Sequence, residues 1–125
     1  MPKTSKKTAS HVEDLGVLEM RTEEIDGYTI EFSTFREDAD GTPFFVGLPD
    51  DRCQSPHWGY VISGALTLRY ADHEETYEAG DAYYAPPGHT PVVTEGTEVV
   101  EFSPTEALAQ TMEVVGRNVA AEMVS

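Results

Sequence analysis

The chain has 125 residues and a mass of 13.8 kDa, a length typical of one domain. It carries 23 Asp and Glu residues against 8 Lys and Arg residues, a formal net charge of −15. All three lysines precede Glu13, the first acidic residue, so residues 11–125 hold five arginines against 23 carboxylates, a balance of −18. Such a body repels phosphate backbones and anionic lipid, so neither nucleic acid nor a membrane surface is an expected partner.

The single cysteine, Cys53, excludes an intramolecular disulfide and is compatible with a reducing compartment. No apolar run is long enough to cross a bilayer, and the basic N-terminus is not followed by the apolar segment of a signal peptide. We therefore expect a cytoplasmic protein. Residues 1–11 are polar and basic, and we expect them to form a flexible tail.

Residues 12–103 consist of short segments separated by Gly and Pro turns, a pattern that predicts an all-β, antiparallel sandwich or barrel. Residues 16–24 and 28–36 alternate apolar and polar side chains, and Asp26-Gly27 between them predicts a hairpin turn. Alternation implies one buried face per strand. We expect Phe32, Phe44 and Phe45 to belong to the core.

Residues 104–125 change to a helical period. Ser103, Pro104 and Glu106 match the N-cap, N1 and N3 positions of a capping box. Apolar side chains then recur every three or four residues, at Leu108, Met112, Val115, Val119 and Met123. We expect this stripe to pack across the barrel or against a partner subunit.

Two stretches of the barrel region carry a recognisable pattern: PHWGYVISG at residues 56–64 and GDAYYAPPGH at residues 80–89. Gly80, Pro86 and Gly88 have the spacing Gly-x5-Pro-x-Gly, and Gly64 ends the first stretch. The pattern resembles the two motifs of the cupin superfamily, over about residues 43–103. The resemblance implies a single-domain cupin barrel of jelly-roll type, a homodimer, and a cavity that takes a metal ion or a small organic ligand.

The metal-ligand positions of the family fall on unusual residues here. His57 stands at the glutamate position of the first motif, and Asp51 and Cys53 stand at its two histidine positions. The histidine position of the second motif is Pro91, while His89 lies two residues earlier. The resemblance therefore makes His57, His89 and Cys53 the candidate metal ligands, with Asp51 as an alternative to Cys53.

Two histidines and a cysteine suit zinc, our first choice of metal, whereas two histidines and Asp51 would suit ferrous iron, our second. Each residue also has a purely structural interpretation: His57 as a core histidine, Cys53 as a small buried side chain, Asp51 as a turn cap and His89 as a side chain that closes its turn. A nucleophilic pair of Cys53 and His57 is disfavoured, because an extended strand would separate them by more than ~10 Å.

Strand alternation also places the aromatic residues. Trp58 has the opposite parity to His57, so we expect it on the exterior, covered by a partner or by the C-terminal helix. One of Tyr83 and Tyr84 must point inward.

The fold does not select a reaction. The chain is either a metal-binding cupin, including an enzyme acting on a small organic substrate, or a metal-free ligand-binding or structural dimer domain.

Overall fold

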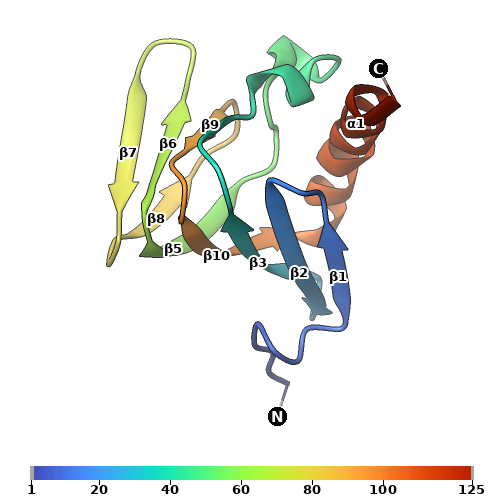
Figure 1. The fold of residues 1–125 in the computed structure, drawn as a ribbon, viewed down its shortest axis with the longest axis vertical. Helices are drawn as coiled ribbons and strands as arrows, with labels where there is room; N and C mark the ends of the chain where they lie inside the picture. The colour runs from blue at the N-terminus through green and yellow to red at the C-terminus, as the bar shows by residue number, and fades with distance from the viewer. Residues whose placement is uncertain (1, 125) are drawn as a thin grey trace.

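The computed structural model describes residues 2–124, which form two antiparallel β-sheets and one C-terminal helix (Figure 1). The larger sheet has six strands in the order β1-β2-β3-β10-β5-β8. These strands are β1 His11–Asp14, β2 Leu18–Ile25, β3 Tyr28–Phe35, β10 Glu98–Pro104, β5 His57–Ser63 and β8 Ala82–Ala85. The architecture is the all-β jelly-roll barrel that the sequence predicts.

The smaller sheet has four strands in the order β4-β9-β6-β7. Its strands are β4 Ala39–Asp40, β9 Thr90–Val93, β6 Ala65–Arg69 and β7 Glu74–Glu78. Two 3-10 turns, η1 Thr42–Phe45 and η2 Pro49–Asp51, lie between β4 and β5, and helix α1 spans Thr105–Val124. No helix within residues 2–124 is both long and apolar enough to cross a membrane.

The hairpin between β2 and β3 turns at Asp26 and Gly27, as predicted. Both residues have positive φ, 51° and 81°, and Ile25 pairs directly with Tyr28. Two consecutive positive φ angles define a type I′ turn, whose twist matches that of the flanking strands. The Asp-Gly pair thus sets the register of the first long hairpin.

The core lies between the two sheets. Its buried side chains come from both of them and are Val61, Leu66, Leu68, Tyr83, Ala85, Val93 and Val99. Tyr83 points inward and Tyr84 outward, while Trp58 is 45% exposed on the outer face beside Tyr28 and Tyr84. The expectation of an outward-facing Trp58 therefore agrees with the structure, but neither α1 nor another element covers it.

The face of strand β3 that points into the cavity is not the one that carries most of its apolar residues. Glu31, Ser33 and Phe35 line the interior, whereas Tyr28 and Phe32 lie on the outer face. The prediction that Phe32 is a core residue is therefore wrong. Alternation shows that the two faces of a strand differ, but not which of them points inward. In β3 the inward face is the one that carries Glu31 and Ser33.

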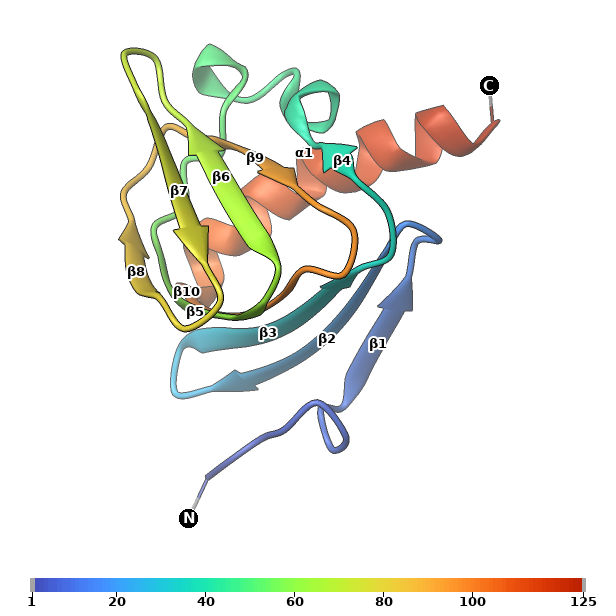
Figure 2. The same cartoon turned by 60° about the vertical axis from the view of Figure 1, so that its left-hand side comes forward.

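Helix α1 begins at Thr105, one residue later than predicted, and Ser103 does not cap it. Ser103 is a buried residue of β10, and its hydroxyl pairs with His57 instead. The helix packs on η1, where Asn118 Nδ2 donates to the carbonyl oxygens of Phe44 and Val46 (Figure 2).

The apolar stripe of α1 faces the barrel of its own chain. Leu108, Met112, Val115 and Val119 all line the interior cavity, so the stripe closes one side of the barrel. The predicted fifth member, Met123, has a side chain outside the described part of the structure.

The last residue of the expected N-terminal tail, residues 1–11, belongs to a strand. His11 is the first residue of β1 and pairs with Thr22. Before it, Lys6 forms an ion pair with Glu98 of β10.

Gly59 offers a test of the barrel packing. A Cβ atom built there would lie 2.4 Å from Cζ of Tyr83, its cross-strand neighbour. We expect Gly59→Ala to lower the free energy of unfolding by about 1–3 kcal/mol, the usual cost of overpacking, measured by urea denaturation. The control is Gly116→Ala on α1, where nothing lies within 4 Å of the new atom, and which should stabilise the protein by about 0.5–1 kcal/mol. Equal effects of the two substitutions would contradict the packing described here.

Candidate metal centre

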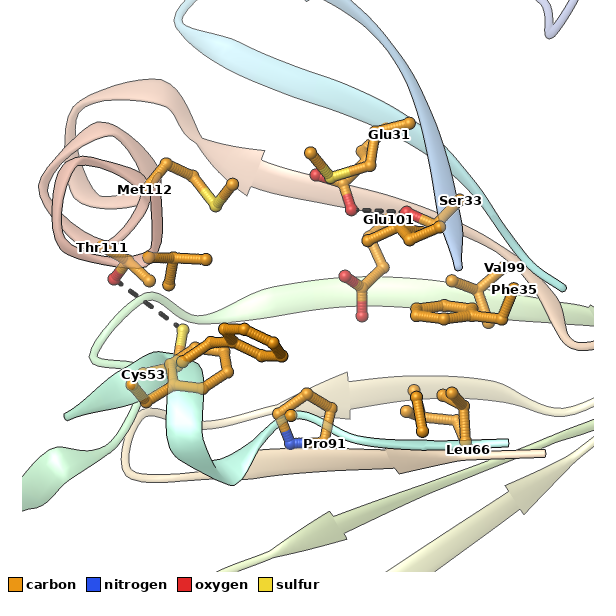
Figure 3. A pocket seen from close by; sticks show the side chains of 18 of the residues that line it. Glu31, Ser33, Phe35, Cys53, Leu66, Pro91, Val99, Glu101, Thr111 and Met112 are labelled. Carbon is orange, nitrogen blue, oxygen red and sulfur yellow. Dashed lines mark hydrogen bonds between the residues drawn. The ribbon is translucent and has the colours of Figure 1, made fainter. Parts of the chain in front are cut away.

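A cavity of about 360 Å³ lies inside the barrel, between the sheets and α1 (Figure 3). Its walls are mostly aliphatic and aromatic, with contributions from β2, β3, β6, η1 and α1. The polar side chains that reach it are few: Glu31, Ser33, Cys53, His57, His89, Glu101 and Thr111. An apolar cavity of this size with a few convergent polar groups is the usual form of a small-molecule site.

Cys53, His57 and His89 converge on this cavity. Each offers one ligand atom, and these atoms lie within 4.8 Å of one another. Cys53 Sγ lies 3.6 Å from His57 Nε2, and the three side chains are only 3%, 7% and 2% exposed. The structure thus brings together the three residues that the family resemblance selects.

Strand alternation is not what unites Cys53 and His57. Residues 54–56 are not part of a strand, and β5 begins only at His57. Cys53 instead pairs with His89 in an isolated bridge, in which the amide of Cys53 donates to the carbonyl of His89 at 2.8 Å. The expected separation of the two side chains by an extended strand is therefore wrong.

Hydrogen bonds fix both imidazole rings. His89 Nδ1 donates to the carbonyl oxygen of Pro86 at 2.9 Å, which leaves Nε2 as the atom with a free lone pair. Within residues 2–124, no group hydrogen-bonds to that Nε2. His57 Nδ1 lies 2.6 Å from Ser103 Oγ, so its Nε2 faces Cys53. Orientation of the distal nitrogen by a partner on Nδ1 is characteristic of metal-binding histidines.

Burial keeps all three groups uncharged when no cation is bound. It lowers the pKa of His57, and together with the nearby His57 it lowers the pKa of His89 to about 4. Burial also raises the pKa of Cys53 to about 11. A thiol with such a pKa is a poor nucleophile, so the contact between Cys53 and His57 does not create a catalytic thiolate.

Asp51 stands apart from this cluster. It lies in η2, exposed and with a positive φ of 55°, and its Oδ1 accepts a hydrogen bond from the amide of Gly47 at 3.0 Å. It is therefore a turn residue, and the alternative donor set containing Asp51 is not assembled. Pro91, at the histidine position of the second motif, forms part of the cavity wall.

The sequence analysis missed Glu31 and Glu101. The two residues pair directly across β3 and β10, and both line the cavity. Ser33 Oγ donates to Glu31 Oε2 at 2.6 Å, and the Tyr83 hydroxyl donates to Glu101 Oε2. Burial raises the pKa of each carboxyl, and the neighbouring Glu101 raises that of Glu31 further. The available signal was a glutamate within the apolar run Val99–Phe102.

A family comparison identifies a known domain in the part of the chain that holds these residues. The profile of the family described as "Cupin domain" matches residues 52–103, which include the three clustered residues. No curated protein matches the chain. In sequence, residues 52–103 of this chain are thus similar to cupin domains.

Solved structures share the fold at low sequence identity. An RmlC-like cupin from Shewanella frigidimarina is 22% identical, with a TM-score of 0.58 over 81% of this chain and 88% of that one. KdgF from Halomonas sp. is also 22% identical, with a TM-score of 0.55 over 75% and 87%. A Rhizobium leguminosarum protein of unknown function is 17% identical, with a TM-score of 0.58 over 82% and 95%. These similarities establish the fold.

The buried carboxyls predict how stability depends on pH. A carboxyl whose pKa is raised by folding binds its proton more tightly in the folded state, so stability falls as pH rises above the unfolded value of 4.5. Glu31→Gln should therefore reduce the loss of unfolding free energy between pH 5 and pH 8, measured by urea denaturation at each pH.

The matched control is Glu98→Gln in β10, because Lys6 holds the pKa of Glu98 below its usual range. Its contribution is present above pH 4.5 and is lost in acid, so this substitution should leave the change between pH 5 and pH 8 as in the wild type. A change in unfolding free energy between pH 5 and pH 8 that is the same in Glu31→Gln as in the wild type would contradict the raised pKa of Glu31.

Proposed function

We propose that this cupin binds a divalent transition metal through Cys53, His57 and His89, and that the metal serves the binding or conversion of a small organic molecule in the cavity. The observation that carries the proposal is the convergence of three buried ligand atoms, with the Nε2 of His89 unbonded within the described residues. A buried nitrogen lone pair aimed at a thiol and a second imidazole is explained by ligation.

The donor geometry supports zinc. With Zn–S near 2.3 Å and Zn–N near 2.0–2.1 Å, tetrahedral angles place sulfur and nitrogen about 3.6 Å apart. Cys53 Sγ and His57 Nε2 are 3.6 Å apart, so these two donors need no rearrangement. Thiolate and imidazole favour zinc over magnesium or calcium. Iron remains the second choice, with two imidazoles as ligands.

The charge inside the barrel also favours a cation. Two glutamates line the cavity, and no Lys or Arg is among its described lining residues. A buried negative charge without a counter-charge is costly. A divalent ion bound by the Cys53 thiolate and two neutral imidazoles would add a net positive charge to the same cavity.

When bound, the metal would act as a Lewis acid toward a ligand atom at its open position. The chain's own groups have separate roles: Ser103 and the Pro86 carbonyl orient the two imidazoles, and the apolar walls exclude water. The metal-free alternative is a cavity in which the same histidines orient a ligand by hydrogen bonds. A cysteine that stays reduced, and so can bind a metal, fits a reducing compartment, which supports a cytoplasmic location.

The test is zinc binding to untagged, chelator-treated protein. We expect about one zinc per chain by elemental analysis, and a loss of affinity of at least about 100-fold in His57→Ala and Cys53→Ser, measured by competition with a chromophoric chelator. Ser103→Ala should weaken binding by about 10–100-fold, because it removes only the partner that orients His57. His11→Ala, in an exposed strand, is the control and should bind as the wild type does.

Two results would contradict the metal proposal. One is sub-stoichiometric zinc, iron, manganese, nickel and copper in the wild type, which would favour the metal-free alternative. The other is full metal occupancy in His57→Ala, which would show that the metal binds elsewhere.

We further propose that the protein is a homodimer formed through the outer face of the larger sheet. Of the eight exposed large apolar side chains in the described residues, seven lie on this face: Val12, Tyr28, Trp58, Tyr60, Ile62, Tyr84 and Phe102. The stripe of α1 is used inside the barrel and is not available. Because each copy carries a net charge of −15, the apolar part of this face, over β5, β8 and β10, is where two copies can approach.

Sedimentation equilibrium at micromolar concentration tests the dimer. We expect Phe102→Ser to weaken it by about tenfold or more, as for an aromatic residue at the centre of an interface. Val46→Ser, at an exposed site outside the larger sheet, is the control and should leave the dimer intact. Salt should strengthen a dimer of like-charged chains, whereas it would weaken binding to a basic partner. A monomeric wild type would refute this proposal.

A further inference from the structure

The pair of glutamates at the cavity wall is not used by the metal cluster. Glu31 and Glu101 lie on neighbouring strands, and Figure 3 shows both side chains reaching into the cavity, apart from Cys53. Directly paired residues on one face of an antiparallel sheet have Cβ atoms about 4.5–5.5 Å apart, so one small group can contact both carboxyls.

Each carboxyl has one committed and one free oxygen. Ser33 donates to Oε2 of Glu31, and Tyr83 donates to Oε2 of Glu101. The Oε1 atom of each has no hydrogen-bond partner within residues 2–124. Both donors sit beside the carboxyls and hold them in place, which leaves the free oxygens as acceptors for a group inside the cavity.

The surroundings define what that group must be. Around the carboxyl pair the cavity is apolar, with Met20, Phe35, Val99, Leu108 and Met112 among its lining residues. The pair offers acceptors and negative charge, while no Lys or Arg among the described lining residues offers a positive one. A ligand with an anionic group would be repelled there, and one without any donor would leave the two acceptors unpaired.

We propose that the cavity binds an apolar amine, whose ammonium group lies between Glu31 and Glu101 and whose hydrocarbon part fills the space lined by the barrel and α1. The inference rests on the proposed function in one respect, that the cavity is the binding site. It names the class of organic ligand and does not require the metal.

The test is isothermal titration calorimetry on chelator-treated protein at pH 8, with butylamine, hexylamine, hexan-1-ol and hexanoate as probes. We expect hexylamine to bind more tightly than butylamine, by about fourfold for each added methylene group. Hexanoate should bind at least about tenfold more weakly than hexylamine, because charge-assisted hydrogen bonds are replaced by repulsion. Hexan-1-ol should lie between them.

Variants assign the ammonium site. Glu101→Gln should weaken hexylamine binding by about tenfold and leave hexan-1-ol binding almost unchanged, since the amide still accepts from Tyr83 but carries no charge. Glu31→Gln is the second variant, with the same expectation, in case the first unfolds. Glu98→Gln, the same substitution on the same strand but outside the cavity, should bind hexylamine as the wild type does.

Four outcomes overturn the inference: hexanoate binding as tightly as hexylamine, equal affinity for butylamine and hexylamine, full hexylamine affinity in both cavity variants, or no binding of any probe. Zinc titration of the same preparation separates this inference from the metal proposal. Amine binding without zinc binding would overturn the metal site alone, and zinc binding without amine binding would overturn only the ligand class.

Discussion

The bridge between Cys53 and His89 is the interaction on which the candidate site depends. The amide of Cys53 donates to the carbonyl of His89, and the amide of Gly88 donates to the carbonyl of Cys53. These two bonds join the loop before β5 to the turn before β9, so segments more than thirty residues apart present their side chains to one point. Gly88 has a φ of 100°, which a glycine adopts without strain, and this places the turn for the bridge. Without the bridge, His57 would face the cavity alone.

The cavity has two polar regions with different chemistry. Cys53, His57 and His89 are neutral donors that suit a soft metal ion, because burial keeps the proton on the thiol and disfavours a second proton on each imidazole. Glu31 and Glu101 are hydrogen-bond acceptors in the middle of two long strands, β3 and β10. Both regions lie in an apolar barrel, where electrostatic interactions are strong and unpaired groups are costly. This combination explains why a cation and a donor-bearing apolar molecule are the ligands that fit.

Much of the fold was predictable because it rests on local signals. The Asp26-Gly27 turn, the Gly and Pro punctuation and the change to a helical period are each written in a few adjacent residues. Local signals also misled. The spacing of Ser103 to Glu106 matches a capping box, yet the Ser103 hydroxyl is used by His57, forty-six residues away. Likewise, the apolar face of β3 is its outer face. The prediction failed there because a surface face rich in aromatic residues has the same sequence pattern as a buried face.

The sequence alone determined the fold class, the strongly acidic body and a short set of candidate metal ligands. The tertiary structure decided which of them meet. Cys53 joins the two histidines because it is bridged to His89 and lies outside the strand that begins at His57, whereas Asp51 accepts a hydrogen bond from the amide of Gly47. It also revealed Glu31 and Glu101, whose separation along the chain hides a direct pairing across two strands. The physical reason is the same in each case. Side-chain identity is local, but convergence in a barrel is set by strand pairing and loop bends that link distant segments.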